Sequence, residues 1–396
     1  MQTTQPKSGR RARSPWPTLP LLAPIARAVV LLALIASAAV VPAEAAKQRV
    51  RIVASLPNLG SIARDIGGDR VEVTTIALGV QDAHFVDPKP SYIVRLRAAD
   101  LLLVNGLDLE IGWIPPLVQG ARTARLMPGG LSYVDCSQGI QVLEVPALLS
   151  RAEGDVHPYG NPHYLADPLN AESVAGTIAE ALKRIDPDGA GKYEDRRRDF
   201  VARLHAALFG SELVGLVGGP KLAREAAGGN FDLLLDGTRI GGQPLRARLG
   251  GWLGTMQPFR GRPIVTYHRD YSYFAARFGL RVVGYLEPKP GIPPAPKHLE
   301  EIAALLQSGA ARVIVTRPYV EHRSTDLVAS RTGATVLTLP LEAGGAPGTD
   351  DYLKLLDHVV GAIAGALRDT GAPPAAGDAP AGSAPPGRAP VHPAGG

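Results

Sequence analysis

PIVTYHRDYSYFAARFGLRVVGYLE, residues 263–287, alternates short apolar runs with an aromatic-rich segment of helical pattern. PIVTYH (263–268) has the length and β-branched content of a buried strand. YSYFAARFG (271–279) has the pattern of a helix, and LRVVGYLE (280–287) that of a second strand. Strand, helix and strand in direct succession form a βαβ unit, in which the two strands lie parallel in one sheet. The stretch therefore predicts an α/β fold.

The alternation extends on both sides of this stretch. Towards the C-terminus the pattern predicts a helix, a strand, a helix, a strand and a final helix, in the order 297–309, 311–319, 324–333, 335–341 and 350–367. Near the N-terminus it predicts strands at 49–57, 71–78 and 100–106, and helices at 59–67 and 91–99. Strands that alternate with helices are typical of parallel sheets. The sequence therefore predicts two α/β lobes.

A helical segment separates the two lobes. Residues 170–208 carry amphipathic helical patterns, with Asn170 as the expected N-cap. We expect an N-terminal lobe at 46–169, a helical connector at 170–208 and a C-terminal lobe at 251–370. This is a fold of two lobes with parallel sheets, joined by a long connecting helix. The Gly-rich segment 209–250 fits the rhythm of neither lobe, and we interpret it as an insertion.

The two ends of the chain carry patterns of their own. Basic residues, the apolar run AVVLLALIASAAVV (28–41) and Ala43-Glu44-Ala45 give residues 1–45 the pattern of a cleaved secretory signal peptide. The apolar run is too short to span a bilayer comfortably. Because no cysteine lies near the predicted cleavage site, the sequence does not predict a lipid anchor. Residues 371–396 are rich in Pro, Ala and Gly, which predicts a disordered tail. We therefore expect an exported protein, by the general or the twin-arginine route.

Charge and cysteine content exclude several classes of partner and site. The formal charge of +5 falls to about +1 once the predicted signal peptide is removed. Because no basic patch remains in the mature chain, the sequence does not predict a nucleic-acid partner. The single cysteine, Cys136, excludes an intramolecular disulfide and a cysteine-rich metal site. A transition metal would have to be bound by His, Asp or Glu side chains.

Three of the nine histidines differ from the others in their placement. His84 follows a strand of the first lobe, and His268 ends the strand IVTYH of the second. His163 lies in a loop just before the helical connector. Ligands of open α/β sheets gather at the carboxyl ends of strands. Each histidine taken singly is more typical of an ordinary loop residue, but three of them from both lobes favour one shared metal site.

Four stretches, in this order, carry a family resemblance: DAHFVDPKPS (82–91), GNPHYLADP (160–168), VTYHRDYSYFAARFGL (265–280) and GTDDYLKLLDHVV (348–360). On these stretches the chain resembles the TroA-like (cluster A-I) zinc and manganese receptors of bacterial ABC importers, over most of residues 49–368. The resemblance implies four metal ligands where the lobes meet: His84, His163, His268 and Asp350. Asp351 is the alternative for the fourth position.

The resemblance also implies which ion is bound. Imidazole nitrogens and one carboxylate oxygen suit Zn²⁺, and His268 favours zinc over Mn²⁺, because manganese receptors of this family tend to carry Glu there. Asp87 and Asp167 either support ligand histidines by hydrogen bonds or, as we favour, cap a helix or close a turn. His157 is either an auxiliary capture ligand or an exposed loop histidine.

The function implied is that of a monomeric periplasmic receptor, not an enzyme, which delivers zinc to a membrane permease. Histidines must be deprotonated to bind a metal, so we expect the affinity to fall steeply below about pH 6. The alternatives are a manganese receptor, a receptor for an iron chelate or vitamin with Trp252, Tyr271 and Tyr273 in its cleft, and a zinc hydrolase. A hydrolase needs an open fourth position, which Asp350 would fill, and the sequence contains no HExxH or GxSxG motif.

Overall fold

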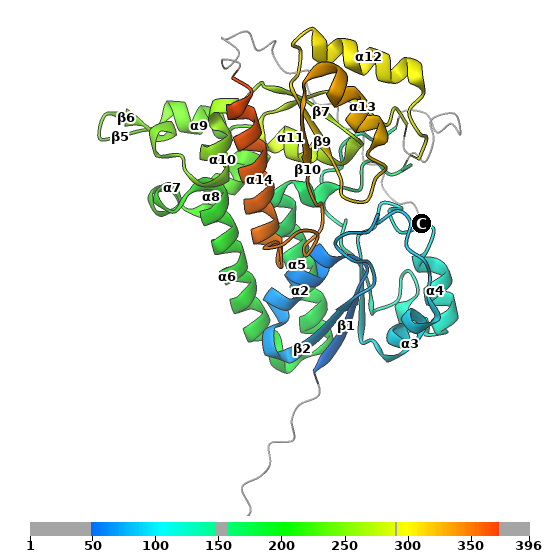
Figure 1. Ribbon diagram of the computed structural model, residues 1–396. Coiled ribbons are helices and arrows are strands. Elements are labelled where there is room, and N and C mark those ends of the chain that lie inside the picture. The colour runs from blue at the N-terminus through cyan, green and yellow to red at the C-terminus, as the bar shows by residue number, and fades with distance from the viewer. Residues whose placement is uncertain (1–48, 147–156, 290, 372–396) are drawn as a thin grey trace, which may run out of the picture. The chain divides into compact units, whose positions relative to one another are not determined.

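The structure is a computed structural model that describes residues 49–146, 157–289 and 291–371. The predicted signal peptide and nearly all of the predicted tail lie outside these residues. Two parallel four-stranded sheets, each with helices, are joined by a long helical segment, as predicted (Figure 1). In the described part of the chain, no single helix is long and apolar enough to cross a membrane. One bent helix pair, Pro187–Phe209 with Ser211–Val217, meets that criterion by length and composition only.

The N-terminal sheet has the strand order β2-β1-β3-β4, with all neighbours parallel. Its strands are β1 (Val50–Ala54), β2 (Val71–Thr75), β3 (Leu101–Val104) and β4 (Tyr133–Asp135). Its helices are α2 (Pro57–Gly67), α3 (Pro90–Ala98) and α4 (Ile114–Ala121), of which α4 is not predicted from the sequence. All four residues of β3 are buried. A strand that is apolar on both faces is typical of the centre of a parallel sheet.

The C-terminal sheet has the strand order β10-β9-β7-β8, again parallel throughout. Its strands are β7 (Pro263–Thr266), β8 (Arg281–Tyr285), β9 (Val313–Thr316) and β10 (Thr335–Thr338). Its helices are α11 (Ser272–Phe278), α12 (Pro296–Gln307) and α13 (Arg323–Thr332). The predicted βαβ unit of residues 263–287 is confirmed, because β7 and β8 pair in parallel on either side of α11. Gly279 ends α11 in the left-handed conformation, with φ of 72°.

Two long helices, α5 (Pro168–Ile185) and α6 (Ala190–Phe209), connect the two sheets and pack against each other and against α2. Asp167 caps α5, because its side chain accepts a hydrogen bond from Leu169 N (3.0 Å). The prediction of Asn170 as the cap is wrong, since the helix already begins at the proline after Asp167. Proline suits this position because its missing N–H would have no partner in the first turn.

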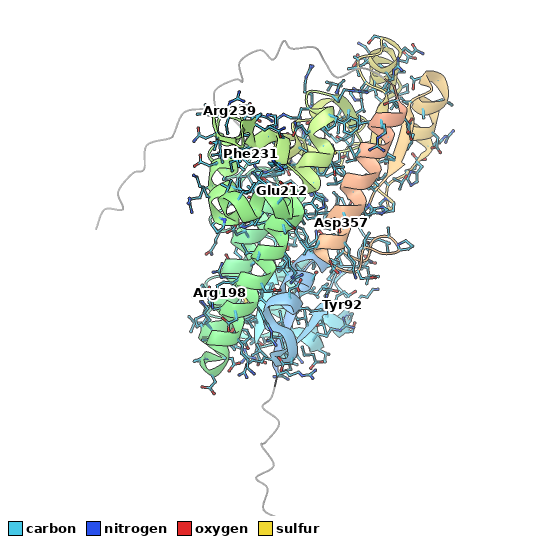
Figure 2. All side chains as sticks on the ribbon, turned by 90° about the vertical axis from the view of Figure 1, so that its left-hand side faces the viewer. Tyr92, Arg198, Glu212, Phe231, Arg239 and Asp357 are labelled. Carbon is cyan, nitrogen blue, oxygen red and sulfur yellow. The ribbon has the colours of Figure 1, made fainter. Side chains whose placement is uncertain are left out.

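The segment between α6 and the C-terminal sheet is mostly helical (Figure 2). It contains α7 (Ser211–Val217), α8 (Gly219–Ala227) and α9 (Phe231–Gly237), a short hairpin of β5 (Arg239–Ile240) and β6 (Gln243–Pro244), and α10 (Gly251–Met256). Leu213, Leu222 and Leu235 are fully buried. The segment that the sequence marks as an insertion therefore has a small core of its own, continuous with the main core.

The last helix, α14 (Tyr352–Asp369), returns to the N-terminal lobe. The N–H of Tyr352 donates to Ser61 Oγ of α2 (2.9 Å). Asn58 of the same helix accepts a hydrogen bond from Ala343 N (2.8 Å) through its side chain. The loop between β10 and α14 is therefore fixed against α2.

Candidate metal centre

The three histidines singled out from the sequence all lie in loops, between or next to secondary-structure elements. His84 lies in the loop that follows β2, and His268 lies two residues after the end of β7. His163 immediately precedes a single 3-10 turn, Tyr164–Ala166, which leads into α5. Two of the three positions lie in loops that follow parallel strands, on the carboxyl side where α/β folds place their ligands.

The three rings converge. One ligand atom from each of His84, His163 and His268 lies within 4.8 Å of those of the other two. The ring centroids of His84 and His163 are 5.2 Å apart, those of His84 and His268 are 5.5 Å apart, and those of His163 and His268 are 5.4 Å apart. Residues from both lobes thus form one cluster, as the sequence predicts.

His84 is held by a carboxylate two residues before it. Its Nδ1 donates to Asp82 Oδ1 (2.7 Å), and its backbone N–H donates to the same oxygen (3.0 Å). The indole of Trp113 donates to Ala83 O (2.8 Å) and anchors the loop to the core. In the tautomer that donates from Nδ1 to Asp82, Nε2 carries the lone pair, and this atom lies on the side of the other histidines.

His268 is oriented in the same manner from the neighbouring strand. Its Nδ1 donates to Glu287 Oε2 (2.5 Å). Thr266 of β7 is paired with Tyr285 of β8. His268 and Glu287 each follow two residues later, just beyond the end of their own strand, so they lie side by side. The N–H of Glu287 donates to Tyr267 O (2.8 Å), which continues the ladder past the strand ends. Nε2 of His268 is therefore the nitrogen left for a ligand.

His163 is placed by Asn161 and carries an unsatisfied nitrogen. Asn161 Oδ1 accepts from the backbone N–H of His163 (2.9 Å), while Asn161 Nδ2 donates to Arg269 O (2.6 Å), beside His268. Asn105, after β3, donates to Pro162 O (3.0 Å). The Nε2 atom of His163 is buried without a hydrogen-bond partner. A buried nitrogen without a partner is costly unless something binds it, and a metal ion would satisfy it.

Burial favours the neutral form of the other histidines in the cluster, His163, His268 and His157. It lowers the pKa of His163, an effect increased by the neighbouring histidines, and it lowers the pKa of His268 to about 4 despite the hydrogen bond to Glu287. Burial likewise lowers the pKa of His157 to about 3. Burial alone would raise the pKa of Asp82, but the hydrogen bonds from His84 and the nearby charge of Arg317 hold it well below its usual range. Neutral imidazoles backed by ionised carboxylates are the form that binds a metal cation.

The predicted fourth ligand lies elsewhere. The side chain of Asp350 is 78% exposed, and its Oδ2 lies 3.8 Å from Lys354 Nζ. The alternative, Asp351, caps α14 by accepting from Lys354 N (2.9 Å). Both aspartates directly precede α14, and neither belongs to the converging group among the described residues. The structure therefore does not place Asp350 at the site.

The aspartates of the two Asp-Pro phrases do not support the histidines. The side chain of Asp87 is exposed, and its carbonyl closes a turn by accepting from Lys89 N (2.9 Å). Asp167 caps α5 and forms two hydrogen bonds with Arg277, from Nε and from an Nη atom (both 2.8 Å). The interpretation as a side-chain cap agrees with the structure for Asp167, whereas at Asp87 the backbone carbonyl and not the side chain closes the turn. The supporting carboxylates are Asp82 and Glu287, which we did not predict.

His157 lies against the cluster. Its Nε2 is 3.2 Å from Nε2 of His84, and the two ring centroids are 5.2 Å apart. The ring is half-buried. His157 nevertheless lies outside the group in which all ligand atoms are within 4.8 Å of one another. Of the two roles expected for His157, an exposed loop histidine does not fit this contact.

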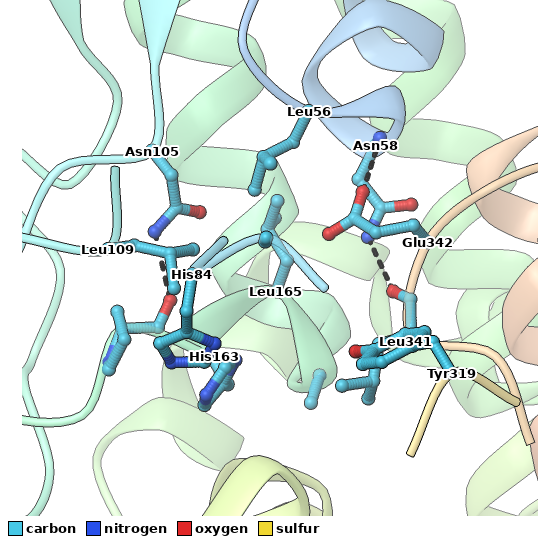
Figure 3. A pocket seen from close by; sticks show the side chains of 13 residues that line it. Leu56, Asn58, His84, Asn105, Leu109, His163, Leu165, Tyr319, Leu341 and Glu342 are labelled. Carbon is cyan, nitrogen blue, oxygen red and sulfur yellow. Dashed lines mark hydrogen bonds between the residues drawn. The ribbon is translucent and has the colours of Figure 1, made fainter. Parts of the chain in front are cut away.

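A small cavity of about 30 Å³ borders His84 and His163 (Figure 3). Glu342 faces it from the C-terminal lobe and accepts a hydrogen bond from Asn58 N (2.8 Å). Burial raises the pKa of Glu342 to about 8, so this carboxyl is largely protonated at neutral pH. The cavity has room for about one water molecule or ion.

The aromatic side chains considered for an organic ligand are part of the core. Trp252, Tyr271 and Tyr273 are all at least 95% buried. The indole of Trp252 donates to Asp357 (2.6 Å), and the hydroxyl of Tyr273 donates to Asn161 O (2.8 Å). Cys136 is also fully buried, as predicted, and burial raises the pKa of its thiol.

The chain matches the protein family ZnuA, described as "Zinc-uptake complex component A periplasmic", over residues 52–208 and 253–366. The chain belongs to the ZnuA family. Residues 209–252 lie between the two matched regions. Members of this family are transport binding proteins and not enzymes, in agreement with the sequence prediction.

Curated relatives within the family are described as binding different metals. The chain is 27% identical over 160 residues to the manganese ABC transporter substrate-binding lipoprotein PsaA of Streptococcus anginosus, covering 40% of this chain and 48% of PsaA. It is 24% identical over 330 residues to the iron-binding protein YfeA of Yersinia pestis, covering 82% of this chain and 88% of YfeA. The chain thus spans about half the length of the streptococcal relatives that it matches.

Solved structures share the fold. A crystal structure of ZnuA has a TM-score of 0.59 at 22% identity and covers 81% of this chain and 99% of its own. The binding protein FpvC of Pseudomonas aeruginosa, in complex with Mn²⁺, has a TM-score of 0.62 at 19% identity and covers 82% and 100%. At these identities the likeness concerns the fold and does not identify the metal.

Proposed function

We propose that the protein is a zinc receptor that holds the ion through His84, His163 and His268. The observation that carries this proposal is the buried and unpartnered Nε2 of His163, within a group of three converging imidazoles. Two of the rings are held by carboxylates at Nδ1, which fixes the tautomer that presents Nε2 to a cation. The arrangement binds and releases an ion.

Nitrogen ligands support zinc as the ion. Imidazole suits Zn²⁺, whereas Mn²⁺ prefers carboxylate and carbonyl oxygens, and at a site of given ligands zinc also binds more tightly. The converging group contains only histidines among the described residues. Manganese is the second candidate, because the streptococcal relatives are described as manganese transporter components.

The family also supports a partner and a compartment. We propose that the protein acts as a monomer in the periplasm, after cleavage near Ala45, and delivers the ion to the membrane permease of an ABC importer. The description of the matched family as periplasmic and the transporter descriptions of the relatives support this proposal.

The decisive test is metal competition on the mature protein. We expect protein stripped with a chelator and then offered equimolar zinc and manganese to retain one equivalent of zinc, measured by mass spectrometry of the washed protein. Retention of manganese in preference to zinc would make the protein a manganese receptor. Retention of neither metal would contradict the receptor function.

The pH dependence of zinc binding should be shallow between pH 5 and 6. His163 and His268 have lowered pKa values in the folded protein, about 4 for His268, so in this window they are already neutral and displace no proton. Because these two ligands displace no proton in this window, the logarithm of the affinity should change by less than two units per pH unit. Affinity is then lost as the pH falls through about 4.

This expectation revises the steep fall below about pH 6 that unperturbed histidines would give. Competition with a chromophoric chelator at several pH values measures the slope. A slope of two or three between pH 5 and 6 would show that the buried histidines are protonated there, contrary to the structure.

An organic ligand is less well supported. Pockets for drug-sized molecules have volumes of about 300–1,000 Å³, whereas the cavity beside the histidines has about 30 Å³. A larger surface cavity of about 360 Å³ lies beside β3 and β4 and is lined by Asp108, Glu110 and Asp135. Carboxylates do not suit an anionic iron chelate.

A further inference from the structure

We propose that His157 is the fourth ligand of the metal ion, so that the ion is held by four imidazoles and by no carboxylate. This inference rests on the proposed metal-receptor function and adds a residue that determines which metal is preferred. The first observation is the distance of 3.2 Å between Nε2 of His157 and Nε2 of His84. Two nitrogens that share a tetrahedral zinc at 2.0–2.1 Å are separated by about 3.3–3.4 Å.

The direction of approach also fits a shared ligand. Nδ1 of His84 is occupied by Asp82, so its Nε2 carries the lone pair that would bind the ion. His157 presents its own Nε2 to that same lone pair. When His84 carries its proton on Nδ1, its Nε2 accepts a hydrogen bond from Nε2 of His157 over the 3.2 Å that separate them. With a metal ion between them, the proton of His157 moves to its Nδ1, and the Nε2 lone pairs of both histidines bind the ion.

The backbone around His157 is built to hold this position. Gly160 N donates to His157 O (3.1 Å) and closes a turn, and Asn161 N then donates to Leu143 O (2.9 Å). Gly160 has φ of 99°, and a Cβ there would lie 2.4 Å from Val142 Cγ1. Only glycine fits this turn without strain. The turn therefore fixes His157 relative to Asn161, which also places His163.

The remaining step is a small movement of the His157 ring. His157 contacts His84 but lies outside the group whose ligand atoms are all within 4.8 Å of one another. Binding therefore turns its ring further towards His163 and His268. Two carboxylates could compete with His157 for the fourth position, and both are less well placed. Asp350 is exposed beside Lys354, and Glu342 already accepts a hydrogen bond from Asn58 N.

Four imidazoles have a consequence for metal choice. Nitrogen ligands favour Zn²⁺ over Mn²⁺, and an oxygen ligand in the fourth position reduces this difference. His157→Asp is therefore expected to narrow the preference for zinc over manganese. Loss of a residue that only supports a metal ligand weakens binding by about tenfold to a hundredfold. Because His157 is a direct ligand in this proposal, His157→Ala is expected to weaken zinc binding by at least that much.

X-ray absorption at the zinc edge tests the assignment directly. The one-to-one zinc complex of the full mature chain should show four imidazoles, and His157→Ala should show three. His157→Cys should add a sulfur at about 2.3 Å, a distance that nitrogen ligands at 2.0–2.1 Å do not give. Cys136 is fully buried and is present in every variant. A sulfur signal that appears only in His157→Cys therefore cannot come from Cys136.

The outcomes separate this inference from the proposed function. If the unaltered protein binds no zinc, the receptor function itself is wrong, and the assignment of His157 fails with it. If the unaltered protein binds zinc but His157→Ala and His157→Cys keep its spectrum and affinity, only the inference is wrong. A loss of affinity in Glu342→Gln or Asp350→Ala, with no change in His157→Ala, would identify a carboxylate as the fourth ligand and also overturn it.

Discussion

His84→Ala and His268→Ala are each expected to weaken zinc binding by about two to three orders of magnitude. The two residues belong to different lobes, but their rings are 5.5 Å apart and contribute to one cluster. A four-ligand zinc site contributes about 10–16 kcal/mol, so one ligand accounts for about 3–4 kcal/mol, and each 1.4 kcal/mol is a factor of ten. Each variant also leaves a carboxylate, Asp82 or Glu287, without its histidine partner.

The measurement is zinc retention and chelator competition on stripped protein. His358→Ala is the matched control, because this histidine is exposed on α14 and should bind zinc like the unaltered protein. Equal losses in both variants would establish a site between the lobes. Full retention by His268→Ala with loss in His84→Ala would mean that the N-terminal lobe binds the ion alone, which would contradict the shared site.

Asp167→Ala is expected to lower the free energy of unfolding of the metal-free protein by about 3–5 kcal/mol, with little change in zinc affinity. The side chains of Asp167 and Arg277 are only 11% and 15% exposed, and they share two hydrogen bonds of 2.8 Å. Removal of the carboxylate leaves the guanidinium buried without its charge partner, which costs about 3–5 kcal/mol when the pair is buried. The helix α5 also loses its cap, a change of about 1 kcal/mol within that range.

Urea unfolding of the stripped protein measures the change, since bound zinc would add its own stabilisation. The double variant Asp167→Ala with Arg277→Leu should recover part of the loss, because no unpaired charge remains. If Asp167→Ala instead lowered zinc affinity by about tenfold or more at unchanged stability, Asp167 would be a support of His163 rather than a structural residue.

Secondary structure near the sheets follows closely from local sequence. The βαβ unit at 263–287 is predicted because apolar strands and an amphipathic helix have different periods, and both are visible in the residues themselves. The sequence does not predict helix α4, since the two prolines in its first turn, Pro115 and Pro116, are also typical of a loop. The cap of α5 was assigned to Asn170 instead of Asp167, an error of the kind expected at element boundaries.

Some residues of the candidate site can likewise be found from local sequence, and others cannot. His84 and His268 could be found because strand ends are recognisable in the sequence. Asp82 could also have been predicted as the partner of His84, because it lies only two residues before it. The Asp-Pro pair after His84 drew the prediction to Asp87 instead. Glu287 becomes a partner of His268 only through the register of β7 against β8, which is a pairing between segments and not a property of either one.

The sequence by itself determined the two parallel-sheet lobes, the helical connector and the three histidines, because each depends on local periodicity or on a position at the end of an element. The tertiary structure alone decided which carboxylates contact the histidines, that Asp350 lies at the start of α14, and that His157 contacts His84. These are distances between residues remote in the chain. They depend on strand register and on how the loop before α14 packs against α2, which no local pattern encodes.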